Sequence, residues 1–414
     1  MKRRTFLKSS AALATATLTP QQSQADDSPL IRSIEKITLR KNRDGKGTTW
    51  FHPRACMIPA EGDSKNPIAF MTLQEIAGSD FFGPVHFSQS SDLGQSWTNP
   101  TGITPLARYP VPDHEGLEQG VCDVVPQYHP ASNSILALGH NVFYRGKHFA
   151  KKDQLARFPA YTVRQPDGTW TSLKKLEWDD PRGAFIYTNN CGQRVVLPNG
   201  DIAMSFTFGA KSTARSVAGV ICSFDGETLK IKKVGPAITS DKGRGLLEPS
   251  VTQYKGKFYM TIRAEDNHGY LAVSDDGLNY SDKIAWSWDD GEALTMSTTQ
   301  QHWLTHSEGL FLVYTRKDSS NSKVIRWRAP LFVAQVDTKK RCLIRSTEQV
   351  VLPLVGDGVN DPDNVALMGN FNVTNVSPDE SWVTAGEWMP RKSAKGNVVL
   401  GKIRWNKKNT SPLY

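Results

Sequence analysis

Outside its N-terminal segment, the sequence lacks any run of about 18 apolar residues, the length that a membrane-spanning helix needs. We therefore expect a soluble mature protein that does not stay in the membrane. The chain also lacks a linker rich in proline, glycine or serine, which favours one domain over several. Hydrophobic residues make up 38% of the 414 residues, enough to bury a core and to argue against long disordered segments.

Several patterns typical of metal and cofactor sites are also missing. The cysteines form no C-x-x-C pair, and neither H-E-x-x-H nor His-x-His spacing occurs. No P-loop, dinucleotide-binding or G-x-S-x-G motif stands in a fitting context. We therefore expect no catalytic metal and no cofactor, with a structural ion as the open alternative. Five cysteines are an odd number, so at least one thiol stays unpaired, and we expect several of them to be buried: Cys56, Cys122, Cys191, Cys222 and Cys342.

The N-terminal segment has the composition of a targeting sequence. Residues 1–25 combine the twin arginine Arg3-Arg4 with a weakly apolar run and a Ser-Gln-Ala stretch that ends at Ala25. This pattern resembles a twin-arginine export signal. The alternative is the basic start of a cytoplasmic protein. We expect a mature single domain over residues 26–414, exported to the periplasm or secreted.

The rest of the chain is only mildly basic. Removing residues 1–25 takes the net charge from +9 to +5, because this segment has four basic residues and no acidic ones. No dense basic block remains, which argues against nucleic-acid binding. Exposed arginines instead suit an anionic sugar or another carboxylate ligand. We expect a glycan or polysaccharide as the partner of a monomeric protein.

Short β-type runs dominate the chain after residue 30. Segments such as KITLR, KFYMTIRAE and NVVLGKIRW recur between turn-forming residues, and helical periodicity is nearly absent. The sequence therefore predicts an all-β protein built from consecutive hairpins.

One turn motif stands out in the segment SQSSDLGQSW. Ser90 and Asp92 can accept hydrogen bonds from backbone N–H groups of a tight turn, and Gly94 can adopt a positive φ. Trp97 can then pack back beneath the loop. The spacing thus predicts a compact turn between two strands.

Shorter versions of this motif occur at Ser223–Leu229 and Ser274–Tyr280, a step of 51 residues. This period fits one four-stranded propeller blade of about 40–50 residues plus loops. The sequence therefore predicts a six-bladed β-propeller, with seven blades as the alternative. The motif resembles the Asp-box turn of sialidases and related BNR-repeat propellers, which also include other enzymes and binding proteins.

The segment LLEPSVTQYKGKFYMTIRAE predicts a hairpin that pairs two opposite charges. With a two-residue turn at Lys255-Gly256, Glu248 and Arg263 lie directly opposite each other and on the same side. An ordinary cross-strand ion pair is one interpretation of this pattern, and a functional site is the other.

The order of charged residues along 45–405 resembles that of sialidases. There, a glutamate opens a blade, an arginine follows on the next strand and an Asp-box comes next, as do Glu248, Arg263 and the turn at 274–280 here. An early arginine and a loop aspartate precede the first box, where this chain has Arg54 and Asp80. Arg326 or Arg328 stands near the C-terminus as a third arginine.

The resemblance implies a role for each residue. Arg54, Arg263 and Arg328 would bind a substrate carboxylate. Asp80 would be the general acid, and Glu248 would activate a tyrosine nucleophile, as in exo-sialidases. In the segment where that tyrosine belongs, this chain has Phe371 next to Asn370, and Tyr314 is the nearest alternative.

A second set of residues suggests a different chemistry. His140 and Tyr144 form the best pair for removing a proton from a uronate, as in propeller-type polysaccharide lyases, which this set resembles. The other members of the set are His52, His129, Arg145, His148, Tyr187, Arg194, His302 and His306. A lyase or rhamnosidase-like enzyme, or a glycan-binding propeller without catalysis, therefore remains an alternative to a sialidase-like glycoside hydrolase.

Overall fold

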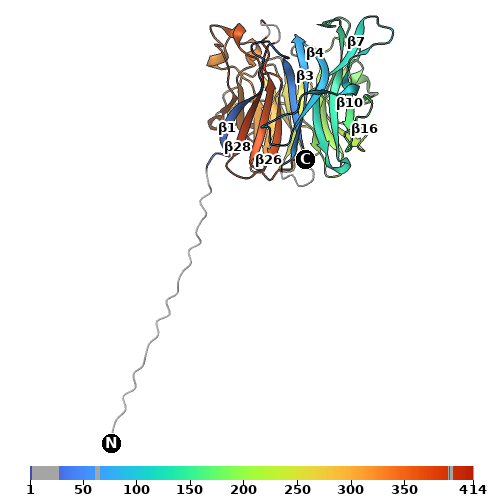
Figure 1. The fold of residues 1–414 in the computed structure, drawn as a ribbon. Helices are drawn as coiled ribbons and strands as arrows, with labels where there is room; N and C mark the ends of the chain where they lie inside the picture. The colour runs from blue at the N-terminus through green and yellow to red at the C-terminus, as the bar shows by residue number, and fades with distance from the viewer. Residues whose placement is uncertain (2–27, 61–65, 390, 392–394, 414) are drawn as a thin grey trace.

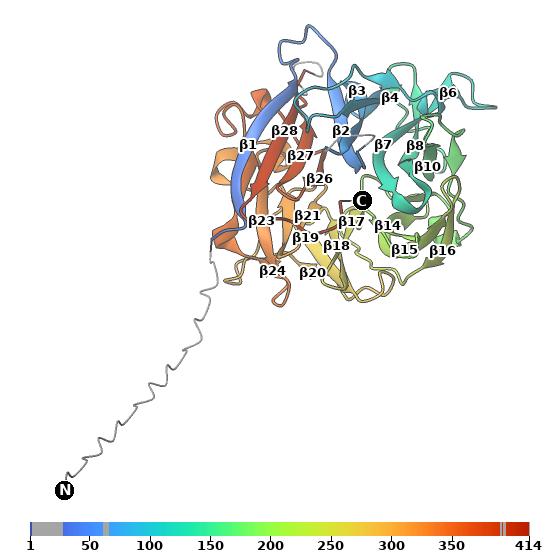
Figure 2. The same ribbon diagram turned by 60° about the horizontal axis from the view of Figure 1, so that its bottom comes forward.

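The computed structural model describes Met1 and residues 28–60, 66–389, 391 and 395–413. The predicted export segment 1–25 therefore lies outside the described residues, apart from Met1. Six antiparallel sheets stand around a common axis like the blades of a propeller (Figures 1 and 2). The predicted all-β, six-bladed fold is confirmed, and the seven-bladed alternative is wrong. No described helix is long and apolar enough to cross a membrane.

Blades one to three follow one another along the chain, each with its innermost strand first. Blade one contains β2 (Trp50–Ile58), β3 (Ile68–Gly78), β4 (Phe81–Ser90) and β5 (Thr101–Gly102). Blade two contains β7 (Leu117–His129), β8 (Ser134–Arg145), β10 (Pro159–Arg164) and β11 (Lys174–Lys175), with β6 (Tyr109–Pro110) and β9 (His148–Phe149) at its margins. Blade three contains β12 (Ile186–Thr188), β14 (Ile202–Gly209), β15 (Ser216–Phe224) and β16 (Leu229–Val234), with β13 (Val195–Val196) beside β14.

Blades four to six continue the ring. Blade four contains β17 (Leu247–Tyr254), β18 (Lys257–Arg263), β19 (Gly269–Ser274) and β20 (Ile284–Ala285). Blade five contains β21 (His302–His306), β22 (Gly309–Tyr314), β23 (Leu331–Asp337) and β24 (Cys342–Leu343), with β25 (Gln349–Leu352) also paired to β23. Blade six contains β26 (Phe371–Ser377), β27 (Glu380–Gly386), β28 (Val398–Trp405) and β1 (Ile31–Arg40). Helical structure in the described residues is limited to short 3₁₀ turns at Thr104–Leu106, Pro130–Ser132, Pro181–Gly183, Ser319–Asn321, Ile325–Trp327, Arg345–Thr347 and Pro362–Asn364.

The two ends of the described chain close the ring. Strand β1 is the outer strand of blade six and runs antiparallel to β28, from Ile31 opposite Trp405 to Arg40 opposite Val398. Three of the four strands of this blade thus come from the C-terminal part of the chain and one from the N-terminal part (Figure 2).

The core lies between adjacent blades. Each blade packs against a neighbour on both faces, so a strand such as β14 is buried along its whole length instead of alternating between core and solvent. Trp286, Trp303 and Trp382 are among the largest fully buried side chains. All five cysteines are buried and unpaired, whereas the sequence predicted only that at least one is unpaired and that several are buried.

The predicted turn between β4 and β5 is confirmed. The Ser90 hydroxyl accepts a hydrogen bond from the Gly94 N–H at 2.8 Å, and the Asp92 carboxylate accepts from Gln95 N–H at 2.9 Å. Gly94 has a φ of +79°, and Trp97 packs 6.0 Å from the ring of Trp382 in the core. The turn therefore holds its shape through side-chain-to-backbone bonds that only these residue types supply.

The two ends of the propeller axis are built from different loops. Turns between the third and fourth strands of each blade lie at one end. The inner strands begin at the other end, which also holds the connections between second and third strands, such as residues 79–80, 264–268 and 315–330. We call this second end the mouth.

Candidate active site

The topology brings the charged candidate residues to the mouth. Glu248 lies near the start of β17 and Arg263 at the end of β18, in blade four. Asp80 lies in the β3–β4 turn and Arg54 in β2, both in blade one, and Arg328 lies between β22 and β23 in blade five. Residues far apart in the sequence thus meet around one end of the axis.

Bulges near the mouth interrupt three of the inner strands. The pairing register shifts at His52 in β2, at Asp123 in β7 and at Glu248 in β17. These residues have positive φ angles of 52°, 57° and 45°. Proline follows at Pro53 and Pro249, where a bulge tolerates its missing N–H group. Strained bulges that redirect a polar side chain are typical of functional sites.

The bulge in β7 places a carboxylate against a buried arginine. Nη2 of the fully buried Arg54 donates to Oδ1 of Asp123 at 2.7 Å, and Nε2 of His52 lies 3.6 Å from the same oxygen. Burial favours a raised pKa for Asp123, but Arg54, His52 and His140 together outweigh it and hold this pKa well below its usual range. Burial lowers the pKa of His52 to about 4, so its ring is neutral near pH 7.

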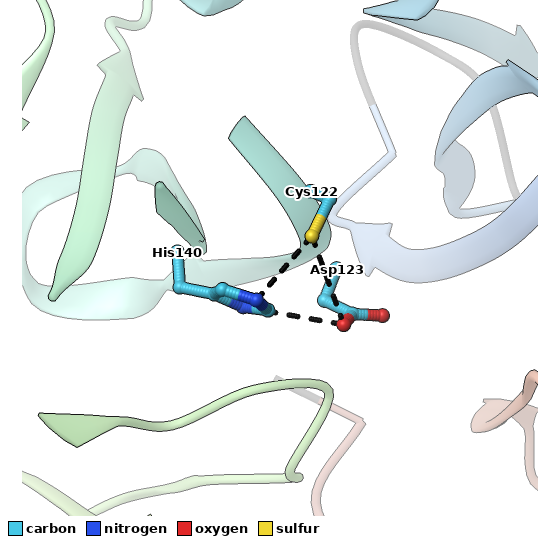
Figure 3. Close-up of side chains that lie close together, drawn as sticks. All are labelled: Cys122, Asp123 and His140. Carbon is cyan, nitrogen blue, oxygen red and sulfur yellow. Dashed lines mark hydrogen bonds and ion pairs between the residues drawn. The ribbon is translucent and has the colours of Figure 1, made fainter. Parts of the chain in front are cut away.

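His140 lies beside the other oxygen of the same carboxylate, and Figure 3 shows it together with Cys122 and Asp123. Its Nδ1 is 4.0 Å from Oδ2 of Asp123, its Nε2 is 3.3 Å from Sγ of Cys122, and Nη2 of Arg157 donates to Nε2. Burial and the charge of Arg157 lower the pKa of His140 to about 3. A guanidinium can only donate, so Nε2 is the unprotonated nitrogen. The lone pair of Nε2, which a general base would use to take up a proton, therefore already accepts a hydrogen bond from Arg157.

The same cluster contains donor atoms suited to a metal. One ligand atom each from Cys122, Asp123 and His140 lies within 4.8 Å of the others, a sulfur, oxygen and nitrogen set typical of zinc (Figure 3). However, Arg54 and Arg157 already donate to two of these groups, and their charges repel a cation. Burial also raises the pKa of the Cys122 thiol well above its usual value, which keeps the thiol protonated. The arrangement therefore favours a hydrogen-bonded network over a cation site.

The predicted hairpin forms, but its register changes before it reaches the charged pair. Lys255 and Gly256 form the two-residue turn, and the expected pairing continues until the bulge in β17. Beyond it, Arg263 faces Leu247, so the prediction of direct opposition to Glu248 is wrong by one residue. The ion pair nevertheless forms, with Nη1 of Arg263 2.5 Å from Oε1 of Glu248.

Arg328 belongs to the same electrostatic group. Burial and the charge of Arg263 lower its pKa to about 10, while Glu248 and Asp80 act in the opposite sense. Arg328 therefore remains a cation near neutral pH. Its side chain lies against Gly369, where an added Cβ would come within 2.7 Å of Cδ of Arg328, so glycine permits this close approach.

Further arginines line the mouth. Nε of Arg244 donates to Glu265 at 2.9 Å, whereas the guanidinium of Arg215 has no carboxylate partner among the described residues. Burial and the charge of Arg157 lower the pKa of Arg215 to about 10. Among the described residues that these contacts and charges connect, arginines outnumber carboxylates: Arg54, Arg157, Arg215, Arg244, Arg263 and Arg328 against Asp80, Asp123, Glu248 and Glu265. Such an excess attracts anionic ligands.

The segment expected to supply a tyrosine nucleophile carries no hydroxyl at the two expected positions. Phe371 is fully buried, with its ring 5.1 Å from that of His302. The side chain of Asn370 accepts a hydrogen bond from the neighbouring blade. Tyr314 is fully buried too, and its hydroxyl lies 2.5 Å from a carboxylate oxygen of Glu348. Tyr314 is therefore held inside blade five.

The remaining candidates of the histidine and tyrosine set have structural surroundings. Tyr144 is buried under the guanidinium of Arg108, which lies 4.0 Å from its ring centroid, and burial raises its pKa. Arg145 and His148 are exposed. Side chains elsewhere in the set form hydrogen bonds within the protein: His129, Tyr187, Arg194, His302 and His306.

Sequence reasoning missed the residues that connect the two candidate sets. Asp123 carried one signal, because it is a lone carboxylate inside the otherwise uncharged run GVCDVVPQY. Arg157, Arg215 and Arg244 lie in loops of three different blades, and no local pattern marks them.

Comparisons with known proteins support the fold alone. No protein-family model matches this chain, and no curated protein sequence does. Among solved structures, a protein of unknown function from Dyadobacter fermentans matches with a TM-score of 0.62 and 12% identity, over 92% of this chain and 100% of that one.

Two sialidases also match. For Trypanosoma rangeli sialidase, the TM-score is 0.60 at 14% identity, over 90% of this chain and 60% of that one. For a Hadza microbial sialidase, the TM-score is 0.61 at 12% identity, over 89% of this chain and 68% of that one. The chain thus has a sialidase-like propeller and spans about three fifths of the Trypanosoma enzyme.

Proposed function

We propose that this protein is an exported, sialidase-like glycoside hydrolase that acts on a glycan carrying a carboxylate. The observation that carries the proposal is the grouping of Glu248, Arg263, Arg328 and Asp80 at one end of the axis, within a set of coupled charges in which arginines exceed carboxylates. The likeness in fold to two sialidases supports the same substrate class. Export rests on the twin-arginine pattern in residues 1–25, and the turn at Ser90–Trp97 would be an Asp-box.

The arginines have hydrogen-bonding capacity to offer a ligand. Nε of Arg54, Arg263 and Arg328, and Nη1 of Arg54, have no acceptor among the described residues. Buried donors of this kind are costly unless a partner binds them. A substrate carboxylate matches the forked geometry of a guanidinium, and of these three arginines Arg328 is the one that is partly exposed and would meet it first, whereas Arg54 and Arg263 are buried.

The two carboxylates suit acid and base roles. Asp80 is exposed at the mouth, and as the acid it would give its proton to the glycosidic oxygen as the bond to the sugar breaks. Because Phe371 and Asn370 have no hydroxyl, Glu248 would take a proton from a water molecule that attacks the anomeric carbon directly. A single displacement by water inverts the configuration at that carbon, unlike hydrolysis through a tyrosine.

A second candidate function is glycan binding without turnover. The replacement of the expected tyrosine by Phe371 and Asn370 favours it, because the arginine group would still recognise a carboxylate. A lyase reaction through His140 has less support, since Arg157 occupies the nitrogen that would accept the proton.

The test uses residues 26–414 and a panel of sialosides and uronate-containing polysaccharides. We expect the release of a reducing sugar with inverted configuration, which nuclear magnetic resonance detects. We expect no absorbance from new double bonds. Asp80→Asn should lower kcat by about 10²–10⁴-fold. Arg328→Gln should mainly weaken binding, and Arg32→Gln, which changes an exposed arginine on β1, is the matched control.

Each other outcome points elsewhere. Unsaturated products would replace the hydrolase proposal by a lyase. Tight binding that is lost in Arg328→Gln, with no product from any substrate, would support the glycan-binding candidate. Equal loss of binding in Arg32→Gln would show a non-specific charge effect and contradict the proposed site.

A further inference from the structure

A cavity of about 200 Å³ lies on the propeller axis, beyond the mouth residues. Its walls come from the inner strands past their bulges, including residues 55–57 of β2, 125–128 of β7 and 372–375 of β26. Pro412 and Leu413, near the C-terminus, also line it. This cavity uses none of the residues assigned to the proposed glycan site.

Arg194 is the only cationic side chain among the described residues that line this cavity. It is 8% exposed, and all of its hydrogen-bond partners are neutral. Nε donates to Oε1 of Gln127 at 3.1 Å, Nη1 to Oδ1 of Asn189 at 3.2 Å and Nη2 to the Val125 carbonyl at 2.9 Å. A guanidinium has five N–H groups, so two remain for another partner.

No described carboxylate forms an ion pair with Arg194, in contrast to Arg54 and Arg263 at the mouth. Burial lowers the pKa of Arg194 to about 10, which leaves it charged near pH 7. The thiols of Cys56 and Cys222 would raise the pKa of Arg194 if they were ionised. However, burial raises the pKa of each thiol to about 12. Both thiols are therefore neutral, and the charge of Arg194 stays uncompensated.

A buried charge without a counter-ion is strongly unfavourable, so proteins pair such charges. We propose that the axial cavity binds a small monovalent inorganic anion, such as chloride, against the free N–H groups of Arg194. One cation balances one negative charge, whereas a divalent anion would leave the cavity with a net negative charge. The cavity exceeds the roughly 30 Å³ that one water molecule occupies in the liquid. Thr252 and Thr305 line the same cavity and carry hydroxyl groups.

The first test is crystallography of the wild-type protein with sodium bromide in place of sodium chloride. We expect an anomalous bromide peak within hydrogen-bonding distance of Nη1 or Nη2 of Arg194. Absence of this peak in well-ordered crystals would overturn the proposal, as would a peak that contacts only surface lysines.

The second test measures the thermal unfolding midpoint while chloride replaces gluconate at constant ionic strength. Chloride should raise the midpoint of the wild type and of the control Arg32→Gln, because a ligand bound only to the folded state stabilises it. Arg194→Gln should show no such rise. An equal rise in Arg194→Gln would contradict the proposal, and the bromide experiment decides independently if this variant does not fold.

Discussion

Mild acid should destabilise this protein, because His52, His140 and His302 are buried in uncharged form. The pKa in the folded protein is lowered to about 4 for His52 and to about 3 for His140 and for His302, whereas an unfolded chain has a histidine pKa of about 6.5. Between these values the unfolded chain binds a proton at each position and the folded protein does not. The free energy of unfolding therefore falls as the pH drops below about 6.5, and the fall ends near the folded pKa values.

The size of the effect follows from the width of this interval. Each pH unit within it costs about 1.4 kcal/mol per histidine. From neutral pH to about pH 4.5, each histidine thus contributes a loss of about 2.5 kcal/mol, or about 7 kcal/mol for the three. This loss is comparable to the whole stability of a marginally stable domain, which is about 5–15 kcal/mol.

Urea unfolding at several pH values, followed by tryptophan fluorescence, measures this dependence. His140→Gln should reduce the loss between neutral pH and about pH 4.5 by roughly a third, because one of the three protons no longer counts. His148→Gln, which changes an exposed histidine, should leave it unchanged. The same pH dependence in the wild type and in His140→Gln would refute the reasoning.

Two further predictions concern the mouth. Asp123→Asn removes the partner of the buried Arg54 and should lower the free energy of unfolding by about 3–5 kcal/mol in urea titrations. Adding Arg54→Met should recover part of the loss, and no recovery would mean that the ion pair is not its cause. Gly369→Ala places a Cβ within 2.7 Å of the Arg328 side chain, and displacing this side chain should weaken binding of an anionic glycan by about tenfold or more in calorimetry. Unchanged affinity would show that Arg328 does not bind the ligand.

The fold could be predicted from the sequence because its signals are local. The turn at Ser90–Trp97 contains within eight residues the hydroxyl, the carboxylate and the glycine that shape it, and its repetition sets the blade length. Six blades followed from that length. No such local signal fixes which strand closes the ring, and the pairing of β1 with β28 comes from residues at opposite ends of the chain.

The site could be predicted only in part, for the same reason. The Glu248–Arg263 pair was found because both residues belong to one hairpin, although the bulge at Glu248-Pro249 changed their register. A proline inside a strand was the available sign of that bulge. The contacts of Asp123 with Arg54 and of His140 with Arg157 depend on bulges and loop paths, which hydrophobic patterns do not encode.

The pairing of β1 with β28 makes the protein circular in space although its chain is linear. Asn406 donates from its backbone to the Leu30 carbonyl at 2.8 Å and from its side chain to the Pro29 carbonyl at 2.6 Å, so the two ends of the folded ring touch. A short linker between them, with a new opening in a surface turn such as Lys255-Gly256, would keep every blade and its neighbours. The order of the blades along the chain therefore depends on where the chain is opened, whereas the order of the blades around the ring does not.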